Sequence, residues 1–251
     1  MDASQAITVV YPIRIESDKQ DFMLPHLARS LRSVNEQETP CEIMAIDYGT
    51  GDRWRPMLYS MLSHYGVTNI HRVEAPHWAR GRALNVGLRA CTTPYFAAMD
   101  ADCLLDPRYT QTLSALAGPR KFVLSCVRRL HAGVRTYQDA LANPARMVHP
   151  DEGHGLICAP TKWLTSVRGY DEYYRIWGQE DSDLLERAKL AGLIVQHVPT
   201  AQVPQHLPHP GQERWLGEAA LQQARRLNAV RFRDMLAQRR VVAPQKTWGL
   251  G

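Results

Sequence analysis

Two aspartates, Asp100 and Asp102, follow a short apolar run, Tyr95–Met99. An apolar run that ends in charged residues is typical of a buried strand leaving a sheet. If the chain is still extended there, both carboxylates project to one side and repel each other unless a cation or a donor lies between them. A hard divalent cation is the simplest partner. An isolated Asp-X-Asp also caps turns at strand ends, so the interpretation depends on the other clusters.

Three further clusters bear on this interpretation. Residues 80–87 place two arginines at the expected start of a helix, where they suit a diphosphate or a carboxylate. Residues 177–183 join an aromatic ring and a glycine to acids, so the ring could stack a sugar and a carboxylate could accept a hydroxyl proton. Residues 206–209 hold two histidines, which are potential metal ligands. Taken singly, each cluster is equally well explained as an exposed helix face, helix-capping acids or a solvated loop.

The elements that carry these clusters alternate between strand and helix in the first half of the chain. This order predicts βαβ units in a mostly parallel sheet, with ligand sites at the carboxyl ends of its strands. Asp47, Asp100 and Asp102 all fall at such ends. The strands are expected at Ile7–Ile15, Cys41–Asp47, Asn69–Glu74 and Tyr95–Met99, and the helices at Phe22–Val34, Trp54–Tyr65 and Arg80–Ala90.

The second half of the chain has a less regular pattern. Strands are expected at Lys121–Val127, Gly155–Ala159 and Leu193–Val198, helices at Thr161–Val167 and Leu184–Ala191, a loop at Val203–Gly211, and a long helix or helix pair at Arg214–Arg240. The sequence has no internal repeat and no low-complexity linker, so nothing divides it into independent domains.

The composition is that of an ordinary globular protein. Of 251 residues, 45% are hydrophobic and 22% are charged, and no apolar run approaches membrane-spanning length. The start of the chain lacks the features of a signal peptide, so a cytoplasmic location is expected. The five cysteines are odd in number and widely spaced, which favours reduced thiols over a disulfide framework or a zinc ribbon.

Basic residues gather at the end of the chain. The net charge is +5, and the segment from Gln212 onward holds eight Lys or Arg against three Asp or Glu, an excess that equals the net charge. This segment could approach an anionic surface, although a solvated helix face is the simpler explanation.

In this order and spacing, the clusters resemble the GT-A glycosyltransferases of family 2 and the galactosyltransferases that carry Trp-Gly-Gly-Glu-Asp-Asp-Asp. The match covers roughly Ile7–Pro210. Here that motif reads Trp-Gly-Gln-Glu-Asp-Ser-Asp at residues 177–183, and the helix motif reads Arg-Ala-Leu-Asn-Val-Gly at residues 82–87. The resemblance implies an α/β, Rossmann-like single domain at residues 1–211, with a nucleotide-sugar half (1–105) and an acceptor half (106–211). A basic helical tail (212–251) would follow.

The resemblance also implies a role for each matching residue. Residues expected to contact the donor are Pro12, Arg14, Asp47, Arg80, Asn85, Asp100 and Ala101. Asp102 would bind Mn²⁺ or Mg²⁺, with His206 as a further ligand and His209 as the competing choice. The acceptor would contact Trp177, Gly178 and Glu180, and the general base would be Asp181. The chain departs from the motifs at Tyr48, Gln179 and Ser182, which replace two acids and a glycine.

These roles predict a metal-dependent, inverting glycosyltransferase that uses a nucleotide sugar, with a UDP-sugar as the expected donor. The acceptor, whether glycan, lipid, protein or nucleic acid, is not indicated. A sugar nucleotidyltransferase is a second possibility, but it usually carries a glycine-rich phosphate loop after the first strand, and Pro12–Glu16 has no glycine. A third is a non-catalytic module that binds nucleotide sugar or nucleic acid through the basic tail, in which case Asp181 is dispensable and binding weakens with salt.

Overall fold

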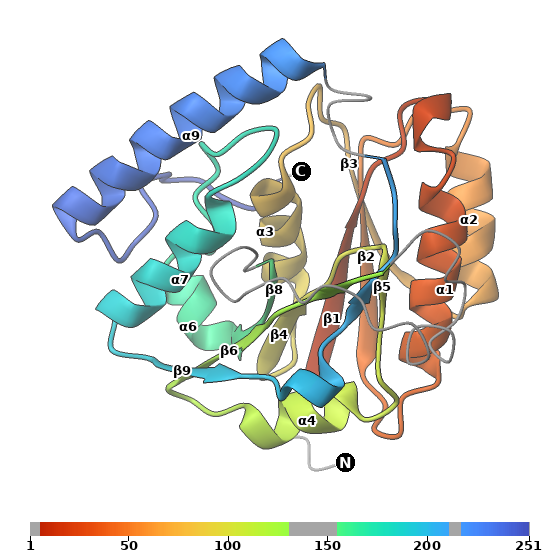
Figure 1. Ribbon diagram of the computed structural model, residues 1–251, viewed down its shortest axis with the longest axis horizontal. Coiled ribbons are helices and arrows are strands. Elements are labelled where there is room, and N and C mark those ends of the chain that lie inside the picture. The colour runs from red at the N-terminus through yellow and green to blue at the C-terminus, as the bar shows by residue number, and fades with distance from the viewer. Residues whose placement is uncertain (1–5, 131–154, 211–216, 251) are drawn as a thin grey trace.

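A central sheet of seven strands organises the molecule (Figure 1). The computed structural model describes residues 6–130, 155–210 and 217–250. The sheet has the order β3-β2-β1-β4-β8-β6-β9 and is parallel except at β8, which is antiparallel to both of its neighbours. This confirms the predicted α/β class with a mostly parallel sheet. The strands are β1 (Ile7–Ile13), β2 (Glu42–Tyr48), β3 (Asn69–Val73), β4 (Tyr95–Ala98), β6 (Lys121–Ser125), β8 (Leu156–Pro160) and β9 (Ile194–His197).

Strand β1 lies inside the sheet and is buried along its whole length. Because successive side chains point to opposite faces, Val9 and Tyr11 join one hydrophobic cluster and Val10 joins the other. Pro12 lies within this strand, which continues to Ile13. Pairing of β1 with β4 ends at Val10 and Ala98, so the missing N–H of Pro12 costs no ladder bond on that side.

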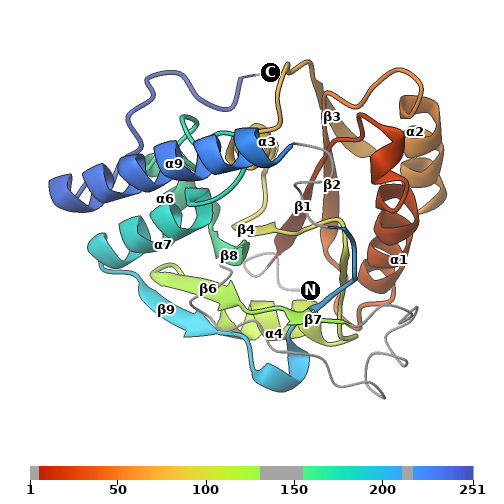
Figure 2. The same cartoon turned by 45° about the horizontal axis from the view of Figure 1, so that its top comes forward.

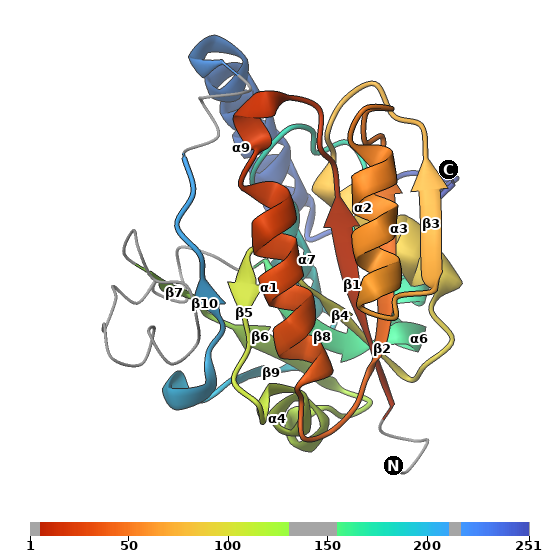
Figure 3. The same ribbon diagram turned by 90° about the vertical axis from the view of Figure 1, so that its right-hand side faces the viewer.

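Helices cover both faces of the sheet (Figures 2 and 3). Helices α1 (Met23–Asn35) and α2 (Arg55–His64) pack on one face, and α3 (Arg80–Ala90), α6 (Thr161–Ser166) and α7 (Glu180–Leu190) pack on the other. Helix α4 (Tyr109–Leu116) lies beside β6, and the long α9 (Glu218–Gln238) lies outside α7. Two short 3₁₀ helices, Asp18–Gln20 and Thr200–Gln202, complete the helical elements of the described residues.

Most predicted elements exist, with boundaries that differ by a few residues. Helix α3 has the expected bounds, whereas α7 begins at Glu180, four residues before the expected Leu184. The loop prediction for Val203–Gly211 was wrong in part, because Gln205–His206 forms β10 in a small second sheet with β5 (Cys103–Leu104) and β7 (Arg128–Arg129). The sequence did not predict α4. The predicted segments at Gly211 and at 214–216 lie outside the described residues.

The cysteines of the chain are free thiols, as expected: Cys41, Cys91, Cys103, Cys126 and Cys158. Of the helices in the described parts of the chain, none is long and apolar enough to cross a membrane.

Gly87 allows α3 to approach the sheet closely. A Cβ at this position would lie 2.5 Å from Cγ1 of Val10 and 3.3 Å from Cδ1 of Ile46. The first distance is shorter than Cβ atoms tolerate and the second is tight, so the close helix–sheet contact favours the glycine that interrupts the apolar stripe of α3.

We expect Gly87→Ala to destabilise the protein by about 1–3 kcal/mol through overpacking. Helix propensity alone would stabilise the variant by about 1 kcal/mol, so the sign of the change is diagnostic. Chemical denaturation measures it, with Ser60→Ala on the exposed face of α2 as the control. A Gly87→Ala protein as stable as the wild type would contradict the close-packing explanation.

Candidate functional site

The two aspartates that follow β4 face different partners. Both carboxylates would project to one side only if the chain stayed extended, and this condition is not met, because β4 ends at Ala98 and the chain then turns. The Cys103 backbone N–H donates to the Asp100 carbonyl oxygen at 3.4 Å, which closes the turn. Ala101, between the two acids, is buried in the hydrophobic core. Each carboxylate is therefore neutralised separately.

Asp100 is bound by Arg80 at the start of α3. Both Nε and Nη2 of Arg80 donate to Oδ1 of Asp100, at 2.9 and 2.8 Å, and Nη2 also donates to the Gly155 carbonyl oxygen at 2.7 Å. The third nitrogen, Nη1, is buried and has no hydrogen-bond partner among the described residues. A buried guanidinium donor without a partner is suited to an anionic ligand such as a diphosphate.

Asp102 lies against two imidazoles. His206 Nε2 is 3.5 Å and His209 Nε2 is 3.1 Å from Asp102 Oδ2. One ligand atom from each of the three residues lies within 4.8 Å of the others. One carboxylate and two imidazoles suit a divalent transition metal such as Mn²⁺, so these residues fit the predicted ion. The structure brings both candidate histidines to Asp102, rather than one of them.

Strand pairing and ring stacking hold the histidines beside Asp102. In β10, His206 pairs with Cys103 of β5, the residue after Asp102, and the Leu207 N–H donates to the Asp102 carbonyl oxygen at 2.8 Å. His209 stacks on Phe22, with ring centroids 5.0 Å apart and planes 8° from parallel. On α1, His26 Nε2 donates to the Pro208 carbonyl oxygen at 3.1 Å, which fixes the loop between the two imidazoles.

Proton affinities in this cluster follow from burial and charge. Burial opposes ionisation of Asp102, but His206 and His209 outweigh it, and the pKa of this carboxyl is lowered. Burial alone would lower the pKa of His209, yet the hydrogen bond and the charge of Asp102 raise it. His209 therefore binds a proton more tightly than a free imidazole does, and a metal ion at this nitrogen would compete with that proton.

A second pair of acids, Glu180 and Asp181, begins α7. Burial, and then the negative charge of Asp181, raise the pKa of Glu180 to about 7, while Arg80 opposes the rise. Glu180 is 8% exposed, whereas Asp181 is half-buried and accepts the Ser182 N–H at 2.7 Å. Charges of both acids act on Arg80, as does that of Asp100. The predicted donor and acceptor groups thus share one electrostatic neighbourhood.

Trp177 and Gly178 lie on the loop before α7. Trp177 is 42% exposed, and the Arg225 guanidinium of α9 lies over its ring, 4.7 Å from the centroid. Gly178 and Gln179 have left-handed φ values of +95° and +76°. Gln179 therefore stands where the family motif has glycine, in a backbone conformation that favours glycine.

Three predicted donor residues organise loops in this structure. Asn85 is fully buried and binds the backbone of Tyr170 through both amide atoms, at 2.9 and 2.8 Å. Asp47 accepts the Thr50 N–H at 2.9 Å and the Tyr59 hydroxyl at 3.1 Å. Arg14 is buried and donates to the carbonyl oxygen of the last residue of β2 and to two carbonyl oxygens after β3. Pro12 lies within β1. Their assignment as donor contacts stays a prediction.

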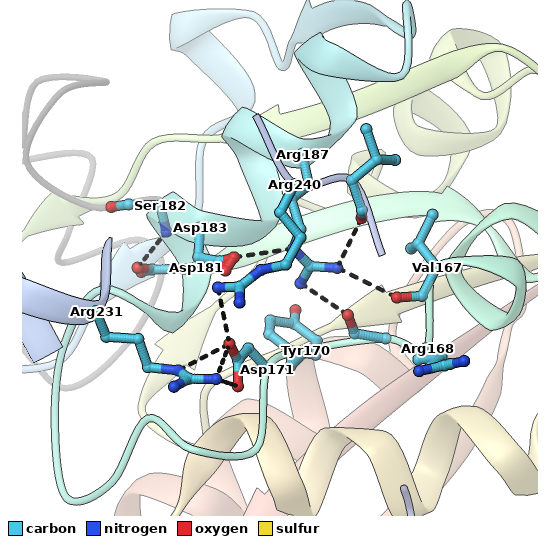
Figure 4. A network of polar contacts seen from close by, with 12 residues as sticks. Val167, Arg168, Tyr170, Asp171, Asp181, Ser182, Asp183, Arg187, Arg231 and Arg240 are labelled. Atoms are coloured by element: carbon cyan, nitrogen blue, oxygen red, sulfur yellow. Dashed lines mark hydrogen bonds and ion pairs between the residues drawn. The ribbon is translucent and has the colours of Figure 1, made fainter. Parts of the chain in front are cut away.

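Sequence reasoning missed a buried polar network beside these acids (Figure 4). Arg187 is fully buried, donates to Asp183 Oδ2 at 2.9 Å and to the Gly169 carbonyl oxygen at 2.8 Å, and so joins α7 to the turn before Tyr170. Asp171 is 1% exposed and is bound by Arg231 of α9. The sequence held one indication of this network: from Gln212 onward, basic residues outnumber acidic ones, so some arginines there lack acidic partners within the tail and can pair with acids elsewhere in the chain.

Comparison with known proteins identifies the sequence and its fold. The profile of Glycosyl transferase family 2 matches residues 19–173, more than half of the chain. The profile described as the N-terminal domain of galactosyltransferase matches residues 147–210, which include the acids at 180–181 and both histidines. No curated protein matches the sequence significantly.

Solved glycosyltransferase structures share the fold. The mannosyltransferase PcManGT from Pyrobaculum calidifontis, in complex with GDP-Man and Mn²⁺, is 17% identical with a TM-score of 0.60, over 92% of this chain and 64% of that chain. GalNAc-T7 with UDP, GalNAc and Mn²⁺ is 17% identical with a TM-score of 0.67, over 92% and 48%. S. aureus TarS 1-349 with UDP-GlcNAc is 13% identical with a TM-score of 0.59, over 90% and 66%. The chain thus spans less than two thirds of each of these three chains.

We expect the affinity for Mn²⁺ to rise from pH 6 to pH 8. The ion competes with the proton that Asp102 holds on His209, so affinity changes by up to about tenfold per pH unit below the raised pKa of that imidazole. Calorimetric titration with Mn²⁺ alone measures the change. His209→Ala should weaken binding, whereas His64→Ala, which alters an exposed histidine of α2, should not. Equal binding by all three proteins would exclude the cluster as the metal site.

We expect Gln179→Gly to stabilise the protein by roughly 0.5–1 kcal/mol, because glycine removes the steric cost of the left-handed backbone at the start of α7. Urea denaturation provides the measurement. Ser182→Gly, at a regular helical position of α7, is the matched control and should lower stability. The prediction is wrong if both substitutions destabilise the protein equally.

Proposed function

The chain belongs to glycosyl transferase family 2, and from this premise we propose that it transfers a sugar from a nucleotide-sugar donor to an acceptor hydroxyl, with metal dependence and inversion at the sugar carbon. The observation that carries the proposal is the meeting of Asp102, His206 and His209 within 4.8 Å, next to the Arg80–Asp100 pair. An anion-binding guanidinium and a set of metal ligands side by side suit a nucleoside diphosphate.

We propose a UDP-sugar as the donor. UDP is named with GalNAc-T7 and TarS, which share the fold, while PcManGT is named with GDP-Man. In this chain the residue after Asp47 is Tyr48, whose buried ring meets Trp78 edge to face with centroids 6.0 Å apart. The base would therefore find no second acid at this position, because the Tyr48 side chain is buried in the core.

Charge neutralisation is the main task of the donor side. A divalent ion, when bound by Asp102 and the two imidazoles, supplies positive charge to the departing diphosphate. Arg80 is held rigidly by Asp100 and keeps Nη1 free of partners among the described residues, so this nitrogen can donate to a phosphate oxygen. Because Asp100 already orients the guanidinium, little side-chain entropy is lost when the donor binds.

We propose that Asp181 accepts the proton of the acceptor hydroxyl. It is the more accessible acid at the start of α7, and general bases contribute about 10²–10⁴-fold to rate. Glu180, with its raised pKa, is protonated over part of the neutral range and can donate a hydrogen bond to the acceptor. Trp177 offers an exposed ring on which a sugar acceptor can stack.

The direct test is a panel of nucleotide sugars incubated with the full chain and Mn²⁺ or Mg²⁺, with and without EDTA. We expect slow release of UDP from one UDP-sugar in the absence of acceptor, and loss of this release on chelation. Activity that persists in EDTA would exclude metal dependence, and release of a different nucleoside diphosphate would exclude a UDP-sugar donor. A chain that turns over no donor would contradict the proposed activity.

Two matched variants separate the roles of the acids. Asp181→Asn should keep donor binding while turnover falls by about 10²–10⁴-fold, and Glu180→Gln should lower turnover less, because it keeps a hydrogen-bond donor. If Glu180→Gln has the larger effect, Glu180 is the base. Full turnover in both variants would remove the acid pair from the mechanism.

A further inference from the structure

We propose that α9 and the segment after it form a brace for the loop at residues 171–180, and that Asn228 and Arg231 are positioning residues for sugar transfer. This inference rests on the proposed function, because the loop carries Trp177 and ends at Glu180. It replaces the expectation of a separate basic tail with an integral part of the acceptor side.

The first contact of the brace is a bidentate ion pair between Arg231 and Asp171. Arg231 donates through Nε to Asp171 Oδ2 at 2.8 Å and through Nη2 to Oδ1 at 2.9 Å (Figure 4). Asp171 is 1% exposed, and Arg240 lies 3.7 Å from the same carboxylate. A buried carboxylate is costly unless a fixed cation pairs with it, so the start of the loop is tied to α9.

In the second contact, one side chain of α9 binds several backbone carbonyl groups of the loop. The Asn228 side-chain nitrogen is within 3.1 Å of the Arg175 carbonyl oxygen and within 3.0 Å of the carbonyl oxygens of Trp177 and Gly178. Asn228 is 4% exposed. Carbonyl oxygens that would otherwise turn toward solvent are thus directed into the α9 interface just before the catalytic acids.

The loop needs external support because its backbone is unfavourable by itself. Ile176 and Gln179 have φ values of +65° and +76°, and a β-branched residue is rarely found in this region. Residues other than glycine are strained in the left-handed region and remain there only where the surroundings hold them. The contacts from α9 offset this strain, and they do so at the residues that set where Trp177 and the start of α7 lie.

The segment after α9 anchors the brace to the body of the protein. Gln245 donates to the Tyr170 carbonyl oxygen at 2.7 Å and to that of Arg168 at 3.1 Å. Ala243 N–H donates to the Val167 carbonyl oxygen at 3.0 Å. These bonds fix the chain beyond α9 to the turn that precedes Asp171, so helix and loop are held from both ends.

The test compares full-length wild type with Asn228→Ala, Arg231→Gln and Arg231→Lys. The control is Arg233→Gln, which removes the same charge from an exposed position of the same helix. Hydrogen exchange of peptides within residues 171–180 reports the loop without any need for activity. Metal-dependent release of UDP from the preferred donor gives kcat and KM for each protein.

We expect exchange in the loop to rise at least tenfold in Asn228→Ala and Arg231→Gln while the central strands stay protected. We also expect kcat to fall about tenfold or more with the donor KM within about twofold of wild type. Arg231→Lys keeps the charge but loses the planar guanidinium that makes the bidentate contact. Its loop exchange and its kcat should therefore lie between those of Arg231→Gln and wild type.

Three results would contradict the brace. The first is loop exchange in Asn228→Ala and Arg231→Gln that equals loop exchange in the control Arg233→Gln. The second is faster loop exchange with an unchanged kcat, and the third is exchange that rises as much in the central sheet as in the loop in both Asn228→Ala and Arg231→Gln. If wild type turns over no donor, the proposed function fails while the exchange measurement still decides whether the brace exists.

Discussion

Neutralisation of buried carboxylates is the constraint on which this structure depends. Acids gather near the carboxyl ends of the strands and in the loop before α7, and burial makes each of them costly unless a cation or a donor compensates. All but one of the pairings join different elements of the chain, and the exception, Asp183 with Arg187, lies within α7. The pairs are Asp100 with Arg80, Asp102 with His206 and His209, Asp171 with Arg231, and Asp183 with Arg187.

These pairings divide the site into two sides with different chemistry. On the proposed donor side, Asp102 with its imidazoles and Arg80, whose Nη1 has no partner among the described residues, are suited to an ion and a diphosphate. On the proposed acceptor side, Glu180 and Asp181 begin a helix whose preceding loop is tied to α9. Because the charges of Glu180 and Asp181 both act on Arg80, the two sides are electrostatically coupled before any ligand binds.

The sequence predicted what local patterns determine. The bounds of Arg80–Ala90 and the alternation of strand and helix followed from apolar periodicity, and the family motifs predicted one of His206 and His209 beside Asp102, where the structure has both. It could not predict the turn at Asp100, the two-residue strand β10, or the burial of Asn85. Those features depend on partners far along the chain: β5 for β10, and the Tyr170 backbone for Asn85. The sequence also did not reveal the role of the tail, because its arginines pair with Asp171, which lies outside the tail.

The central claim is that Asp102 is held by two imidazoles because the three together bind a divalent ion beside the donor diphosphate. Anomalous diffraction from crystals grown with Mn²⁺ and UDP tests it most directly. The account predicts one strong manganese peak in contact with Asp102, His206 and His209, with a phosphate oxygen of UDP next to it. A peak at another place, or the three side chains still paired with each other and free of metal, would contradict it.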